Sequence, residues 1–144
     1  MRASILALAI VCCAGTVRAQ GSTTMSWPDI ASVGPARVVP SGARKQAEDA
    51  IKQGLANPDS VTFRGEKVSV IASIRHDAFA APIDGPISLV CGQYSSKDEK
   101  GVASDYAWFL VTIKRGKVLW TNADDPGSGD GVAYGTCKGA GLAK

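Results

Sequence analysis

The stretch from Tyr106 to Thr121 constrains the fold more than any other part of this chain of 144 residues. Between residues 106 and 114, apolar side chains occupy both sets of alternating positions, which is typical of a strand covered on both faces. One set is Ala107, Phe109, Val111 and Ile113, and the other is Tyr106, Trp108 and Leu110. The dipeptide Arg115-Gly116 leaves room only for a tight turn, so residues 118–121 should return antiparallel. The stretch therefore predicts a central strand of an antiparallel sheet.

The tip of this predicted hairpin is basic, because Lys114, Arg115 and Lys117 cluster there. One interpretation is a site for an acidic partner. The other is that the charges solvate and protect the end of the hairpin.

Residues 41–56 are predicted to form a helix that covers one face of the sheet. Ser41 is a suitable N-cap, and Asn57-Pro58 should end the helix because the residue before a proline avoids the helical region. The apolar positions recur at spacings of three and four, which places them in one narrow stripe. They are Ala43, Ala47, Ala50, Ile51 and Leu55. Since most of them are alanines, the helix can lie close to the sheet.

Two further strand regions are predicted, at residues 61–75 and 87–94. In the first, Gly65 indicates a bulge or break, and the remaining positions alternate between an apolar and a mixed face. The apolar face would carry Val68, Val70, Ala72 and Ile74, and the mixed face Ser69, Ile71 and Ser73. In the second, Ile87, Leu89 and Cys91 share one face. Residues 76–86 are predicted to be a loop because of their Pro and Gly content, and the polar residues 95–104 a solvated connection.

The N-terminal region is typical of an export signal. Arg2 is followed by an apolar run over residues 3–14 that is too short to span a bilayer comfortably. Val17-Arg18-Ala19 places small residues around a cleavage site after Ala19. An uncleaved anchor is the alternative, whereas a lipoprotein is disfavoured because no small residue precedes Cys12 or Cys13. Residues 20–40 are rich in Gly, Ser, Thr and Pro and are predicted to be an extended, mostly mobile leader.

The two remaining cysteines, Cys91 and Cys137, are predicted to form a disulfide, the default for one pair in an exported chain. A redox-active pair is the alternative, but such pairs normally use Cys-x-x-Cys at a helix start. Residues 123–144 are rich in glycine, so we expect a tail that buries little and would wander unless Cys137 held it to the sheet.

Charge excludes two classes of partner. Loss of residues 1–19 removes Arg2 and Arg18 and lowers the formal net charge from +3 to +1. A nearly neutral domain lacks the electrostatic footprint of a nucleic-acid-binding protein. The sequence contains no basic amphipathic helix of the kind that binds a membrane surface. We also expect no membrane insertion after signal cleavage.

No catalytic, metal or cofactor site is predicted. The single histidine, His76, is followed by Asp77, but no nucleophile motif accompanies them. One histidine and two paired cysteines make a zinc site unfavourable. The acidic loop from Asp124 to Gly131 lacks EF-hand spacing and is equally typical of a turn. No glycine-rich phosphate loop precedes a helix.

One pattern in the middle of the chain resembles a known group of sequences. Leu55, Pro58, Ser60 and Phe63 form Leu-x-x-Pro-x-Ser-x-x-Phe, and Val90-Cys91-Gly92 follows. This order resembles small exported bacterial proteins of uncharacterised function, over residues 43–113. The chain departs from that pattern after Cys91-Gly92, where residues 95–99 replace an expected Asn-rich loop. The resemblance implies a location in the bacterial envelope and supplies no catalytic residues.

These observations predict a signal peptide at 1–19, a leader at 20–40 and a single α+β domain at 41–144. We expect an N-terminal helix on a twisted antiparallel sheet of about four strands, closed by the disulfide. A cystatin-like arrangement is the nearest analogy. The alternative is a small all-β sandwich or barrel with a peripheral helix.

The predicted function is a non-catalytic binding module, periplasmic or secreted, with a protein partner in the cell envelope. Aromatic residues anchor interfaces. The candidate interaction residues are Trp27 in the leader and Tyr94, Tyr106 and Trp108, which we expect on one sheet face. The alternatives are a small secreted hydrolase using His76 and a structural subunit of an envelope assembly.

Overall fold

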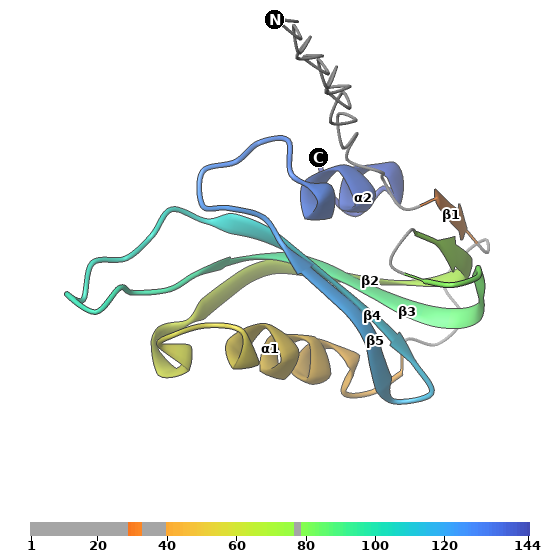
Figure 1. The fold of residues 1–144 in the computed structure, drawn as a ribbon, viewed down its shortest axis with the longest axis horizontal. Coiled ribbons are helices and arrows are strands. Elements are labelled where there is room, and N and C mark those ends of the chain that lie inside the picture. The colour runs from red at the N-terminus through yellow and green to blue at the C-terminus, as the bar shows by residue number, and fades with distance from the viewer. Residues whose placement is uncertain (1–28, 33–39, 77–78) are drawn as a thin grey trace, which may run out of the picture.

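The computed structural model describes residues 29–32, 40–76 and 79–144. They form one antiparallel sheet of five strands in the order β1-β2-β3-β4-β5. The elements are β1 (Asp29–Ser32), α1 (Ala43–Gln53), β2 (Thr62–Arg75), β3 (Ile83–Ser95), β4 (Ala107–Lys114), β5 (Lys117–Ala123) and α2 (Val132–Gly139). Helix α1 lies on one face of the sheet and α2 on the other (Figure 1). The predicted α+β class with one helix on an antiparallel sheet is confirmed, and a second helix and a short fifth strand are added to it.

The N-terminal predictions fall mostly outside the described residues, including the signal peptide at 1–19 and Trp27. Within the predicted leader, β1 pairs with the end of β2, from Asp29 opposite Arg75 to Ser32 opposite Ile71. Its partner lies some forty positions further along the chain, so no local pattern marks this strand. In the described part of the chain, no helix has the length and apolar character needed to cross a bilayer.

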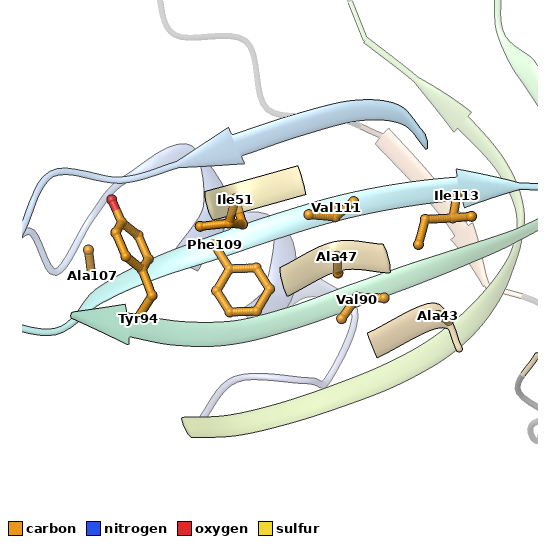
Figure 2. Close-up of a cluster of buried hydrophobic side chains, with 9 residues drawn as sticks. All are labelled: Ala43, Ala47, Ile51, Val90, Tyr94, Ala107, Phe109, Val111 and Ile113. Carbon is orange, nitrogen blue, oxygen red and sulfur yellow. The ribbon is translucent and has the colours of Figure 1, made fainter. Parts of the chain in front are cut away.

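Helix α1 places its alanine stripe against the sheet, as predicted. Ala43, Ala47 and Ile51 are buried in a cluster with side chains from β3 and β4 (Figure 2). The predicted N-cap is wrong: Gly42 occupies that position in a left-handed conformation (φ 92°), and no side chain caps the helix. A 3-10 turn at Pro58–Ser60 then leads into β2.

Strand β2 contains two irregularities, of which the sequence indicated one. Gly65 has a φ of 64°, and the pairing with β3 shifts between Arg64 and Lys67. A second shift lies between Ile71 and Ser73. Because of this second bulge, Ile71 and Ile74 both belong to the buried cluster on the α2 side of the sheet, although strict alternation predicted opposite faces for them.

Strand β3 begins earlier than predicted. Ile83 and Asp84 pair with Ile74 and Ser73, so the predicted loop at 76–86 is shorter by several residues. The predicted faces of β3 and β4 are otherwise confirmed. Ile87, Leu89, Cys91 and Leu110 lie in the α2-side cluster, and Ala107, Phe109, Val111 and Ile113 lie in the α1-side cluster.

The predicted hairpin is also confirmed. Arg115 and Gly116 have φ values of 51° and 74°. Positive φ at both central residues is the requirement of a type I′ turn, whose twist matches that of the flanking strands. Strand β5 then follows antiparallel to β4.

The glycine-rich tail is more ordered than predicted, because its centre is helix α2. Ala133 and Cys137 are fully buried against the sheet, and Ala143 is nearly so. The backbone carbonyl of Cys137 accepts hydrogen bonds from the amides of Leu142 (2.8 Å) and Ala143 (3.2 Å), so the chain folds back after the helix. The predicted attachment through Cys137 is confirmed, but the expectation that the tail buries little is wrong, because it was drawn from glycine content. Small residues also let a helix approach a sheet closely.

Candidate functional site

The position of α2 depends first on the disulfide. Cys91 in β3 and Cys137 in α2 are bonded, as predicted, with their Cα atoms 5.9 Å apart. Both are fully buried, Cys91 in the sheet and Cys137 on the face of α2 that packs against it. The bond therefore holds the helix to the central strand of the sheet.

The position of α2 depends secondly on Asp124, which is buried at the end of β5. Its Oδ1 accepts a hydrogen bond from the amide of Ala133 (2.9 Å), and its Oδ2 accepts one from the amide of Tyr134 (2.8 Å). A side chain at Gly131 would overlap the carboxyl group of Asp124, so glycine is needed for this approach. The first acid of the predicted acidic loop thus caps a helix. Within the described ranges, no group of three or more His, Cys, Asp or Glu side chains is arranged to hold a metal.

With α2 in this position, aromatic and polar side chains form a continuous strip on that face, which we call the aromatic band. Its members come from β2, β3, β4, α2 and the residue before β4. They are Arg64, Gln93, Tyr106, Trp108, Tyr134 and Lys138. The band begins at the strand row in which Arg64 pairs with Gln93 and Gln93 pairs with Trp108. Directly paired residues point to the same face of a sheet.

Contacts between neighbours hold the band together. The Arg64 side chain donates a hydrogen bond from Nε to Oε1 of Gln93 (2.9 Å), and its guanidinium lies 3.5 Å from the centre of the Tyr106 ring. The rings of Trp108 and Tyr134 lie 5.6 Å apart in a tilted arrangement. The amino group of Lys138 lies 5.5 Å from the Tyr134 ring. The three aromatic side chains are half-buried, and the two cations at the ends are exposed.

The structure brings together two of the predicted interaction residues, Tyr106 and Trp108. Tyr94 lies on the other face, 6% exposed in the α1-side cluster (Figure 2). Burial raises the pKa of its phenol, and the charges of Asp125 and Asp124 add to that effect. The prediction that these three aromatics share one face is therefore wrong.

Sequence reasoning missed four members of the band: Arg64, Gln93, Tyr134 and Lys138. The register across the β2 bulge brings Arg64 beside Gln93, and the i,i+4 spacing of Tyr134 and Lys138 becomes informative only once α2 is recognised. The sequence offers no direct signal for either.

His76, the residue of the hydrolase alternative, lies in a separate aromatic group. Its ring stacks on Trp120, with centroids 4.4 Å apart and planes 30° apart. Phe79 lies 6.2 Å from both rings in edge-on contact. Asp77, its proposed partner in that alternative, lies outside the described residues.

On the α1 side, a carboxyl pair joins the helix to the β2 bulge. Burial raises the pKa of Glu66, and a hydrogen bond and charge repulsion from Glu48 raise it further, while Arg44 opposes the shift. The Oε1 atom of Glu66 is buried and has no hydrogen-bond partner. The Glu66 side chain also lies against Gly92 in β3.

The chain matches no family model, no curated protein and no solved structure among those with which it was compared. The resemblance of residues 43–113 to small exported bacterial proteins therefore stays an expectation.

Proposed function

We propose that the mature chain is a non-catalytic binding module of the bacterial envelope, and that the aromatic band is the surface that holds a protein partner. The observation that carries the proposal is the continuity of the band. Arg64 stacks on Tyr106, Trp108 contacts Tyr134, and one row of paired strand residues connects the two groups.

The composition of the band suits protein recognition. Residues that dominate binding energy at interfaces are mostly Trp, Tyr and Arg, and all three types meet here. Tyrosine and tryptophan bury a large area while retaining a polar atom for a hydrogen bond. The amide of Gln93 adds a polar group between the aromatic side chains.

The rigidity of the band also suits binding. Its members stand on paired strands and on a helix fixed by the disulfide and by Asp124. Each side chain that is immobilised only on binding costs about 0.5–1.5 kcal/mol. Contacts that already restrain Arg64, Tyr106 and Trp108 reduce that cost.

The charge of the band indicates the chemistry of the partner. Arg64 and Lys138 are exposed at the two ends, and Lys67 points to the same face because it pairs with Cys91. Complementary charge steers association and sets orientation. We therefore expect a partner segment with apolar or aromatic residues at its centre and acidic residues at its rim.

Site-specific photocrosslinking in cells tests the proposal. A benzoylphenylalanine at position 106 should crosslink to one defined envelope protein, whereas the same group at Val102 should not. Val102 is a suitable control because it is 63% exposed and lies in the connection between β3 and β4.

Two variants then assign the contact to the band. Arg64→Glu should abolish the crosslink at position 106, and Lys100→Glu, an exposed charge in the control loop, should leave it intact. Near-ultraviolet circular dichroism would verify that both variants fold. Equal crosslinking from positions 106 and 102, or an unchanged crosslink in Arg64→Glu, would contradict the proposal.

A further inference from the structure

A separate cavity lies on the opposite face of the sheet, between the first turn of α1 and the β4–β5 turn. Its volume is about 380 Å³, which is within the range of roughly 300–1,000 Å³ found for small-molecule sites. Its floor is one row of paired strand residues, Val70 opposite Ser88 and Ser88 opposite Ile113. The floor is thus an apolar surface with one hydroxyl at its centre.

The helix and the turn supply the rest of the lining. Pro40 and Ala43 add apolar surface from the start of α1, and Pro86 adds more from β3. The side chain of Gln46 donates a hydrogen bond from Nε2 to the carbonyl oxygen of Gly116 (3.1 Å). This bond ties α1 to the hairpin, so the cavity is formed before any ligand enters.

One positively charged side chain lies at the edge of this cavity. Arg115 is part of the lining, whereas Lys114 and Lys117, which pair directly across the hairpin, point to the opposite face of the sheet. Among the described residues, no acidic side chain lines the cavity, and the one ion pair within 4.0 Å joins Lys45 and Asp49 on α1.

We infer that this cavity binds a small amphipathic anion, with a medium-length alkyl chain against Val70, Ile113 and Ala43 and a carboxylate beside Arg115. The apolar lining accounts for the alkyl chain. The guanidinium of Arg115, which has no ion-pair partner within 4.0 Å among the described residues, accounts for the carboxylate, because charge-assisted hydrogen bonds from guanidinium to carboxylate are among the strongest in proteins. The start of α1 also favours binding of the carboxylate, since a helix N-terminus favours negative charge.

Binding of octanoate to the disulfide-bonded mature protein tests this inference, with 1-octanol as the neutral probe of similar length and acetate as the headgroup alone. Octanoate should produce saturable amide shifts in nuclear magnetic resonance spectra at Val70, Ser88 and Gly116. Octanol should bind about tenfold more weakly, as expected for the loss of one charge-assisted contact. Acetate should cause no saturable shift.

Two variants separate the headgroup from the cavity. Arg115→Asn removes the charge and keeps the turn, because Asn-Gly is the preferred type I′ dipeptide. It should weaken octanoate about tenfold and leave octanol unchanged. Ser88→Leu fills the cavity and should abolish binding of both probes, while Lys100→Gln, a distant exposed lysine, should bind both as the parent chain does.

Several outcomes would overturn the inference. If the amide shifts with octanoate do not saturate, or if octanoate binds no more tightly than octanol, the cavity is not an anion site. Unchanged binding in a folded Ser88→Leu variant places the ligand elsewhere. Shifts of the same amides on dilution without any probe would show that a second copy of the chain covers this face. If Ser88→Leu does not fold, the comparison of the two probes in Arg115→Asn decides the matter.

Discussion

The carboxylate of Asp124 is joined to the backbone of Tyr134, whose amide donates a hydrogen bond of 2.8 Å to Oδ2. Its other oxygen accepts from the amide of Ala133 at 2.9 Å. One buried acid at the end of β5 thereby satisfies two of the amides that a helix leaves unpaired at its N-terminus. This arrangement also sets the place of the Tyr134 ring beside Trp108.

Replacing this acid should loosen α2. Asp124→Asn keeps the shape but turns one acceptor into a donor that faces an amide, and it removes the charge. We expect a loss of about 2 kcal/mol in the free energy of unfolding, the usual magnitude for a hydrogen bond to a charged group. Urea denaturation would measure the loss. Asp125→Asn, a neighbouring exposed acid, should have little effect, and equal losses in the two variants would contradict the capping role.

Removing the disulfide should destabilise the whole domain. The bond closes a loop with a sequence separation of 46, for which the chain-entropy relation gives about 4 kcal/mol. The double variant Cys91→Ala, Cys137→Ala should show that loss in chemical denaturation. Peptide mapping of the purified protein under non-reducing conditions should recover the two cysteines as one linked pair, and finding both as free thiols would refute the assignment.

Enlarging Gly92 should strain the core. A Cβ at this position would lie 2.7 Å from Cε1 of Phe109 and 2.9 Å from Cγ of Glu66. Gly92→Ala should therefore cost about 1–3 kcal/mol, as overpacked cores do. Adding Phe109→Leu should recover part of that cost if the clash with the ring is its cause. A double-mutant cycle measures the coupling, and strictly additive losses would show that the ring is not responsible.

Neutralising Glu66 should change how stability depends on pH. Its raised pKa means that the native state holds this proton more tightly than the unfolded chain does. Stability from this group is therefore present at low pH and is lost as the pH rises from the ordinary carboxyl value through the raised one. Glu66→Gln should melt at a higher temperature than the parent chain at about pH 7, and the difference should shrink towards about pH 4.

The control for this comparison is Glu99→Gln, which removes an exposed acid in the loop after β3. It should leave the melting temperature nearly unchanged at both pH values. A stabilisation by Glu66→Gln that is the same at both pH values would show that it arises from packing and not from the raised pKa of Glu66.

Local patterns predicted much of the sheet. The two-sided apolar segment around Phe109 became β4, the turn at Arg115 and Gly116 formed where expected, and Cys91 joined Cys137. The second bulge in β2 was not predictable in the same way. Its effect on Ile71 and Ile74 depends on pairing with β1 and β3, which lie far away in the sequence.

Two of the six members of the aromatic band followed from the sequence, and four did not. Tyr106 and Trp108 were recognised as aromatic residues two positions apart in an extended segment. Tyr94 was placed with them by residue type alone, although its pairing with Ala107 turns it to the opposite face. Tyr134 was missed because glycine-rich composition conceals a helix that tertiary contacts stabilise.

The sequence by itself determined the strand and hairpin framework, the face of α1 and the disulfide. These depend on alternation, on the conformational demands of a tight turn, and on the presence of two cysteines in a chain whose sequence predicts export. Only the tertiary structure decided that α2 exists, because its formation depends on the Asp124 carboxylate and on burial of Ala133 and Cys137. It also decided which aromatic side chains meet, because strand register depends on bulges and on partners distant in the chain.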